Sequence, residues 1–253
     1  MTGKNRNADI CIGTSGWQYK HWKGNFYPAT LPVSRMLSVY CQHFNTVELN
    51  NSFYRLPSAE AFANWRAVTP RSFLFAVKAS RFLTHMKKLK DPESSLQQIL
   101  DNAEKLGEKL GPILFQLPPG WGADPQRLLE LLKLLPRKHR FAFEFRDRSW
   151  HSKRILNLLR AHNAAFCIFE LEGFRSALEI TADFAYVRLH GPGGRYQGNY
   201  SSATLHMWAR RIIGWSHNLR AVYVYFDNDQ AGYAPANALK LRERVHSLGR
   251  RAA

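Results

Sequence analysis

The sequence predicts an α/β protein, a single TIM-type (β/α)8 barrel with its site at the C-terminal rim of the strands. Eight short apolar segments alternate with segments of helical periodicity, and no linker or Pro/Ser-rich break divides the chain. A length of 253 residues is usual for one such barrel, and a hydrophobic fraction of 45% is enough for a sizeable core. The alternative is an open doubly wound sheet, but no G-x-G-x-x-G follows the first strand. The predicted domain spans residues 8–248, with short polar tails at 1–7 and 249–253.

Strands are expected where a short apolar run is followed by a turn or by polar residues. These runs are 10–13, 46–49, 73–78, 113–117, 140–146, 165–169, 184–190 and 221–226. The segment at 171–182 has the weakest helical signal between them.

Helix signals occur between the predicted strands. Ser58 and Ser149 are expected N-caps, and Asp124-Pro125 places an N-cap before a proline at the first helical position. Gly111 is expected to stop a long helix. The expected helices are 31–44, 58–68, 92–110, 124–135, 149–162, 202–217 and 235–248.

The residues that close the strands should be neighbours in space, because all parallel strands of a barrel point their carboxyl ends to one face. The candidate catalytic residues chosen on this ground are Glu48, Lys78, Glu144, His190 and Asp227. Carboxylates near cations in a partly desolvated mouth can have their pKa values moved apart, as acid–base catalysis requires. The alternative is that the charges only neutralise one another and that His190 bonds a loop carbonyl.

Candidate substrate-binding residues lie at the same strand ends and in the following loops. They are Ser15, Trp17, Asn50, Tyr54, Gln116, Arg188, Gly193, Arg195 and Asn228. The glycine-rich loop at 191–194 follows the seventh predicted strand, where many barrels hold phosphate, although it fits no named phosphate motif. The aromatic loops can stack on a sugar or nucleobase, or pack as a lid. The run 146–148 is interpreted as a charge cluster at a helix start.

Composition limits the partners and the compartment. A net charge of +17 favours small anions or nucleic acid, and the alternative is a basic surface that only keeps the protein soluble. The N-terminus has no apolar core and no run approaches a membrane span, so we expect no signal peptide, no membrane partner and a cytoplasmic location. Three scattered cysteines agree with a reducing compartment. A divalent metal is possible, but no ligand spacing indicates one and no metal ligand is assigned; cofactor and oligomeric state stay open.

Nine motifs resemble, in order, those of the YecE-like family, also called domain of unknown function 72. They are IGTSGW (12–17), WKGNFYP (22–28), TVELN (46–50), SFYRLP (52–57), TH (84–85), QLPP (116–119), EFR (144–146), VRLHG (187–191) and YFDND (225–229). The resemblance covers roughly residues 10–245 and implies a TIM barrel. It implies no activity, since the family name records none.

Two classes of function fit these observations. The first is a hydrolase-like or isomerase-like enzyme acting on a phosphorylated or nucleic-acid-related anion. Glu48 or Glu144 would then be the acid or base, Lys78 and Arg188 would hold the anion, and His190 would transfer a proton. A sugar-active hydrolase or isomerase is an alternative within this class. The second class is a non-catalytic binder of nucleic acid or of a protein partner, whose binding through a basic surface should fall steeply with salt.

Overall fold

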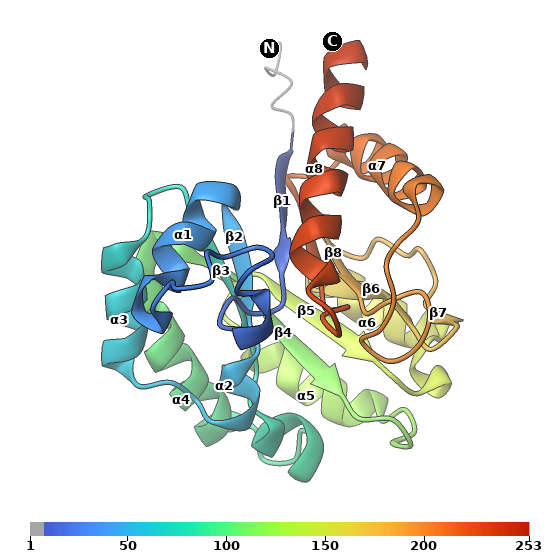
Figure 1. Cartoon of the computed structure of the whole chain (residues 1–253). Coiled ribbons are helices and arrows are strands. Elements are labelled where there is room, and N and C mark those ends of the chain that lie inside the picture. The colour runs from blue at the N-terminus through green and yellow to red at the C-terminus, as the bar shows by residue number, and fades with distance from the viewer. Residues whose placement is uncertain (1–7, 253) are drawn as a thin grey trace, which may run out of the picture.

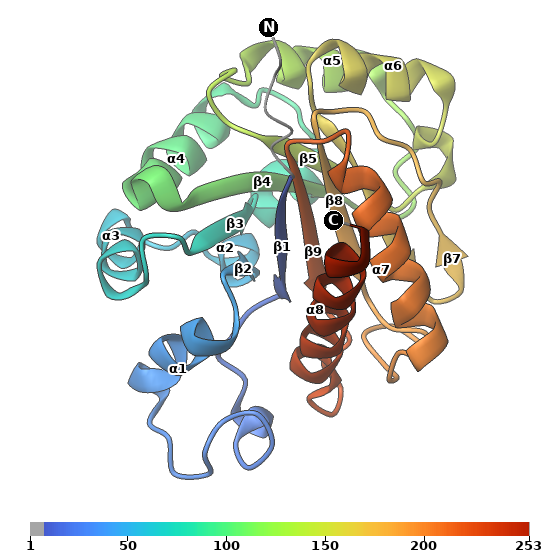
Figure 2. The same ribbon diagram turned by 90° about the horizontal axis from the view of Figure 1, so that it is seen from above.

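The structure is a computed structural model that describes residues 8–252. Within this range, eight parallel strands form a nearly closed barrel with helices around it (Figures 1 and 2), which confirms the predicted TIM-type fold. In their order around the barrel they are β1 (Asp9–Thr14), β2 (Thr46–Leu49), β3 (Leu74–Lys78), β4 (Leu110–Leu117), β5 (Phe141–Phe145), β6 (Ala165–Leu171), β8 (Phe184–Leu189) and β9 (Ala221–Phe226). The first two strands meet only at the bridge between Ser15 and Glu48, so the closure is narrow.

Helices on the outside connect most consecutive strands. The crossover helices are α1 (Met36–His43), α3 (Ala59–Val68), α4 (Glu93–Ala103), α5 (Pro125–Leu134), α6 (Lys153–Ala161) and α7 (Ser202–Ser216), and α8 (Tyr233–Ala252) ends the described chain. The connection from β6 to β8 holds no helix in the described chain. It holds β7 (Phe174–Arg175), which pairs antiparallel with β6 in the segment of weakest predicted helical signal.

Shorter helical pieces lie beside the longer helices or in the loops. They are η1 (Lys20–Trp22), η2 (Val33–Arg35), α2 (Asn51–Tyr54), the π-helix η3 (Phe82–Met86), η4 (Glu104–Lys109) and η5 (Arg148–Trp150). Of these, η2 and η4 fall inside the predicted helices at 31–44 and 92–110, η5 overlaps the start of the one at 149–162, and the others were not predicted. Two of them, α2 and η3, follow the ends of β2 and β3 and thereby form part of the barrel mouth.

Two of the three predicted helix caps are confirmed. Ser58 and Asp124 each accept a hydrogen bond from the backbone N–H three residues on, at 3.3 and 3.0 Å. The prediction for Ser149 is wrong, because the N-cap of α6 is Ser152. Ser149 instead lies in η5, where its N–H and its hydroxyl both donate to Asp147.

The predicted helix at 92–110 is too long. The α-helix ends at Ala103, and Gly107 adopts a φ of 56°, which interrupts the helical backbone. Gly111, predicted to stop the helix, lies inside β4, where an added Cβ would come 3.1 Å from the Phe75 carbonyl oxygen. The glycine therefore permits close strand pairing.

The predicted C-terminal end of the domain, at residue 248, differs from the structure. The helix α8 continues to Ala252, so residues 249–252, predicted as a polar tail, are helical. The predicted tail at 1–7 and residue 253 lie outside the described residues.

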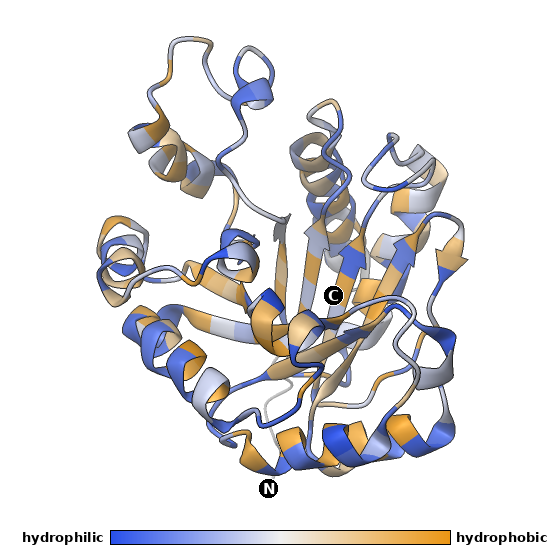
Figure 3. Ribbon diagram, turned by 90° about the horizontal axis from the view of Figure 1, so that it is seen from below, coloured by the Kyte–Doolittle hydropathy of each residue, from blue (hydrophilic) through white to orange (hydrophobic). Residues whose placement is uncertain are grey.

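The strands separate two apolar cores. Outward-facing strand residues such as Val187 and Val224 pack with the helices, while inward-facing ones such as Tyr186 and Tyr223 fill the barrel. Every residue of β2, β5, β6, β8 and β9 is buried, which explains their nearly continuous apolar sequences. Figure 3 shows the hydrophilic outer faces of the surrounding helices. None of the helices in residues 8–252 is long and apolar enough to cross a membrane.

Candidate active site

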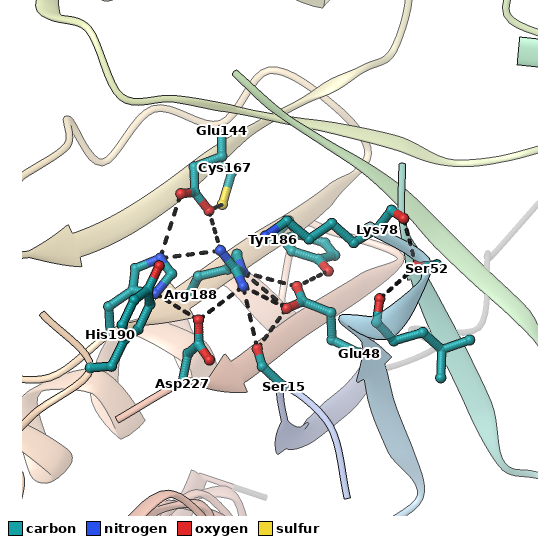
Figure 4. Close-up of polar contacts among 12 residues, drawn as sticks. Ser15, Glu48, Ser52, Lys78, Glu144, Cys167, Tyr186, Arg188, His190 and Asp227 are labelled. Atoms are coloured by element: carbon teal, nitrogen blue, oxygen red, sulfur yellow. Dashed lines mark hydrogen bonds and ion pairs between the residues drawn. The ribbon is translucent and has the colours of Figure 1, made fainter. Parts of the chain in front are cut away.

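Arg188, on β8, is fully buried and binds carboxylates from three other strand ends (Figure 4). Its Nη2 donates to Glu48 Oε1 at 2.7 Å and its Nε to Glu48 Oε2 at 2.9 Å. Its Nη1 donates to Glu144 Oε2 at 2.7 Å, and Nη2 lies 3.2 Å from Asp227 Oδ2. The planar guanidinium suits such multiple pairing, because its donors point in fixed directions.

Glu48 is the most completely paired of these carboxylates. Besides the bidentate pair with Arg188, it accepts hydrogen bonds from Ser15 Oγ at 2.6 Å and from the Tyr186 hydroxyl at 2.7 Å. Its side chain is fully buried. A carboxylate whose oxygens are all engaged is well placed to orient Arg188 and poorly placed to take a proton from a substrate.

The carboxyl groups of Glu144 and Asp227 are held ionised. Burial by itself raises the pKa of Glu144, but Arg146 and Arg188 hold it well below its ordinary value of 4.5. Burial also raises the pKa of Asp227, but the hydrogen bond from His190 and the charge of Arg188 lower it below its ordinary value of 3.8. The cluster is therefore a network of charges that neutralise one another.

His190 joins two of these carboxylates. Its Nδ1 lies 3.0 Å from Asp227 Oδ2, while its Nε2 lies 3.5 Å from Glu144 Oε1 and 3.3 Å from Arg188 Nη1. The side chain is fully buried. Both ring nitrogens thus face charged groups of the network.

Arg146, predicted to belong to a helix-start cluster, lies in this network instead. Its Nε donates to Glu144 Oε1 at 2.6 Å. Its Nη1 and Nη2 make only long contacts, at 3.4 Å to the Tyr196 hydroxyl and at 3.5 Å to His190 Nε2. The neighbouring Asp147 does cap a helix start, so the interpretation was correct for that residue and wrong for Arg146.

Lys78, at the end of β3, differs from the other charged groups of the mouth. It retains only 8% of its exposed surface, yet no described residue places a carboxylate oxygen within ion-pair distance of its ammonium, and no hydrogen bond reaches it in Figure 4. The ammonium lies 4.1 Å from the centre of the Phe53 ring. Burial, and then the like charge of Arg188, lower the pKa of Lys78 from 10.5 to about 8.

His85, in the π-helix η3, lies close to this lysine. Its ring contacts Phe53 edge to face at 4.9 Å, and its Nδ1 lies 2.9 Å from Thr84 Oγ1. Burial, followed by the charges of Lys78 and Arg81, lowers the pKa of His85 to about 4. The imidazole is therefore neutral at pH 7.

Three predicted binding residues lie at the mouth with unused polar atoms. Trp17 Nε1, Asn50 Oδ1 and Gln116 Oε1 are buried and have no hydrogen-bond partner among the described residues. Trp17 and Asn50 line a cavity of about 220 Å³ together with Tyr19. This cavity adjoins the strand ends that carry Ser15 and Glu48.

Four other predicted residues do not join the network. Tyr54 is 80% exposed, and Gly193 is exposed in its loop. Arg195 is half exposed and lies 3.4 Å from Glu172. Asn228 is buried and donates to the Gly198 carbonyl at 2.8 Å and to Asn237, which holds loops together.

Arg146, Tyr186 and His85 were not among the predicted site residues. Two of them follow from strand alternation, because residues two apart face the same side. Tyr186 precedes Arg188 by two residues, and Arg146 follows Glu144 by two. His85 belongs to the TH motif at 84–85, but nothing in the sequence places that motif at the mouth, since a π-helix has no recognisable sequence period.

No group of three or more His, Cys, Asp or Glu side chains in residues 8–252 is arranged to hold a metal ion. The carboxylates of Glu48, Glu144 and Asp227 point instead at Arg188, whose positive charge opposes a cation at the same place. These residues do not fit a metal centre, and we assign no chemical step to one.

A nearly closed parallel barrel with a buried polar network at its C-terminal rim defines a TIM-barrel protein with a candidate site in the usual position. The family model described as "Protein of unknown function DUF72" matches residues 11–252. The chain therefore belongs to the DUF72 family, which confirms the resemblance to the YecE-like family.

Relatives and solved structures agree with this assignment. The UPF0759 protein YunF of Bacillus subtilis (strain 168) is 28% identical across 92% of this chain and 94% of that protein. The UPF0759 protein YecE of Escherichia coli (strain K12) is 28% identical across 57% of this chain and 51% of that protein. A DUF72 family protein from Thermotoga maritima MSB8 has a TM-score of 0.83 at 30% identity, covering 94% of this chain and 99% of that one. A DUF72 family protein from Enterococcus faecalis V583, at 19% identity and a TM-score of 0.81 over 94% of this chain and 95% of that one, supports the fold alone.

Proposed function

We propose that the barrel mouth is the active site of an enzyme that binds a small anionic substrate and uses Lys78 in acid–base chemistry. The observation that carries this proposal is Lys78, which is buried as a residue and whose ammonium has no anionic partner in the described chain. Buried charges in proteins are ordinarily paired, and an anionic substrate would provide the pair here. A lysine whose pKa is about 8 also exchanges protons readily near neutral pH.

A second buried lysine, Lys109, has a structural role, and its ammonium donates hydrogen bonds to protein acceptors. Lys109 retains 4% of its exposed surface, and its Nζ donates to the Arg66 carbonyl at 2.5 Å and to the Thr69 carbonyl at 2.6 Å. It also reaches the Thr69 hydroxyl at 3.2 Å. The contrast with Lys109 supports a functional reason for the unused N–H donors of the Lys78 ammonium.

Arg146 is the second anion contact in this proposal. Its Nε is committed to Glu144, but its Nη1 and Nη2 make only long contacts and are free to shift toward a ligand. A guanidinium edge of this kind matches two oxygens of a carboxylate or a phosphate.

Arg188 and Glu48 act as positioning residues in this proposal. Arg188 is fully buried and already binds three carboxylates, so it has no donor left for a substrate. Glu48 is occupied in the same way. The geometry favours these roles over the expected anion contact by Arg188 and the expected general base at Glu48. Proton transfer by His190, oriented by Asp227, stays a prediction.

The test is anion binding measured by calorimetry. The probes are inorganic phosphate, a phosphorylated sugar and a 2-oxo acid, applied to the native protein, to Lys78→Met and to Lys90→Met, which changes an exposed lysine. Loss of a charged hydrogen bond should weaken binding of the preferred anion about 10-fold to 100-fold in Lys78→Met and leave Lys90→Met unchanged. Equal binding by Lys78→Met, or no binding by any probe, would refute the proposal.

The net charge of +17 favours one other candidate, nucleic-acid binding on the outer surface. A single-stranded oligonucleotide should then bind with an affinity that falls steeply with salt, and Lys78→Met should not alter it. Binding that depends on Lys78 would place the oligonucleotide in the mouth instead.

A further inference from the structure

We infer that Lys78 is a covalent nucleophile and that the substrates of this site are small anions with an aldehyde or ketone carbonyl. The inference rests on the proposed function, because it needs the same anion site. It adds a reaction type, imine formation, and a substrate class.

The residues around Lys78 hold its amine in place without forming hydrogen bonds to it. Ser52 Oγ lies 2.6 Å from the Lys78 carbonyl oxygen and 2.8 Å from the Leu49 carbonyl oxygen, which ties α2 to the ends of β2 and β3. The same short helix carries Phe53, whose ring lies beneath the ammonium. The nitrogen is therefore fixed by packing against a ring, which accepts no strong hydrogen bond. The residue retains 8% of its exposed surface, so it is not completely enclosed.

The charges around Lys78 favour its neutral, nucleophilic form. Burial, the largest cause, disfavours the ammonium and Arg188 adds repulsion, while Glu144, Glu48 and Asp227 act in the opposite direction without cancelling the overall lowering of the pKa. With a pKa of about 8 in place of 10.5, the fraction of free amine at pH 7 is about 300-fold larger than for an ordinary lysine. An imine requires this free amine, because an ammonium has no lone pair.

The chemistry balances without an oxidant or a second reactant. The amine nitrogen of Lys78 forms a bond to the carbonyl carbon, the C=O π pair moves to oxygen, and that oxygen takes one of the two protons of the nitrogen. The carbinolamine then loses its hydroxyl together with the second nitrogen proton as water, and the nitrogen lone pair forms the C=N bond. In this inference His85, which contacts the same Phe53 ring as the Lys78 ammonium and is neutral at pH 7, accepts a proton from the nitrogen and passes it to the oxygen.

Arg146 accounts for the anionic part of the substrate. Its Nη1 and Nη2 make only long contacts, with Tyr196 and His190, and suit a carboxylate or phosphate attached to the carbonyl compound. A 2-oxo acid such as glyoxylate or pyruvate carries both groups at a short spacing and is the simplest probe.

The experiment traps the imine by reduction. The full chain is incubated at pH 7 with glyoxylate or pyruvate and sodium cyanoborohydride, and the modified lysines are mapped by peptide mass spectrometry. We expect Lys78 to be modified at least about tenfold faster than the exposed Lys90, given its larger fraction of free amine. Acetaldehyde, which has no anionic group, should show a smaller preference for Lys78, because only the larger fraction of free amine then favours this lysine. Modification of Lys78 no faster than that of Lys90 would overturn the inference.

Two variants separate this inference from the proposed function. Lys78→Arg keeps the positive charge but cannot form the trapped imine, so it should retain binding of inorganic phosphate and lose the adduct. Lys78→Met should lose both, and circular dichroism checks that each variant is folded. Phosphate binding through Lys78 without any adduct would leave the proposed function standing and reject imine formation. Absence of both would reject both.

Discussion

Lys78→Met should make the protein more stable at neutral pH. The pKa of Lys78 is lowered from 10.5 to about 8, a shift of about 2.5, and each pKa unit corresponds to about 1.36 kcal/mol. The folded state therefore carries about 3 kcal/mol of unfavourable free energy for holding this ammonium at pH 7. Methionine has a similar length and flexibility without the charge, so it can fill the same space.

The sign of the pH dependence follows from proton binding. Between pH 8 and 10.5 the unfolded chain binds a proton at Lys78 more strongly than the folded protein does, so the stability of the native protein rises with pH across this window. The advantage of Lys78→Met should be about 3 kcal/mol below pH 8 and disappear above pH 10.5. Urea unfolding followed by circular dichroism at pH 7 and at pH 10 measures this difference.

Lys109→Met is the matched control at a similarly buried lysine. The Lys109 ammonium donates hydrogen bonds to the carbonyl groups of Arg66 and Thr69. Removal of this ammonium should therefore destabilise the protein by about 1.5–3 kcal/mol per lost charged hydrogen bond. If Lys78→Met also proves less stable than the native protein at pH 7, the ammonium of Lys78 has a partner and the reasoning fails. The same conclusion follows if its effect is equal at pH 7 and pH 10.

Two further predictions concern the network around Arg188. Arg188→Met should lower the free energy of unfolding at pH 7 by roughly 3–5 kcal/mol, because it leaves buried carboxylates uncompensated. The native protein gains stability from Glu144 and Asp227 above their unfolded pKa values near 4.5 and 3.8 and loses it as the pH falls from there through their lowered folded pKa values. The deficit of the variant is relieved once its buried carboxyls take up protons, so the difference in unfolding free energy should be smaller at pH 4 than at pH 7. Tyr186→Phe removes one donor to Glu48 and should cost about 1–3 kcal/mol in urea unfolding, whereas a change under 0.5 kcal/mol would mean that the hydroxyl is replaceable.

Most of the fold could be predicted because barrel strands are short, buried and separated by strong turn or cap signals. The strand at 221–226 and the helix ending at Val68 were predicted with their observed bounds. The helix at 92–110 was overextended because its charged segment has helical character: the α-helix ends at Ala103, and the 3-10 helix that follows contains Gly107 with its positive φ.

The position of the site could also be predicted, but not the pairing within it. Glu48, Glu144 and Arg188 were chosen because each closes a strand, and the structure brings all three together. Which carboxylate meets which cation depends on the height of each side chain in the barrel. That height is set by strand tilt and register, which single-strand patterns do not encode.

The sequence by itself determined an eight-stranded α/β barrel and the set of charged residues at its rim, because alternation and strand ends are local properties of a chain. Only the tertiary structure decided that Arg188 pairs with three carboxylates while Lys78 has no carboxylate partner in the described chain. The partners come from strands up to 140 positions apart, and their distances arise when the barrel closes. Burial at that closure also sets the pKa of Lys78, since desolvation is a property of the folded protein alone.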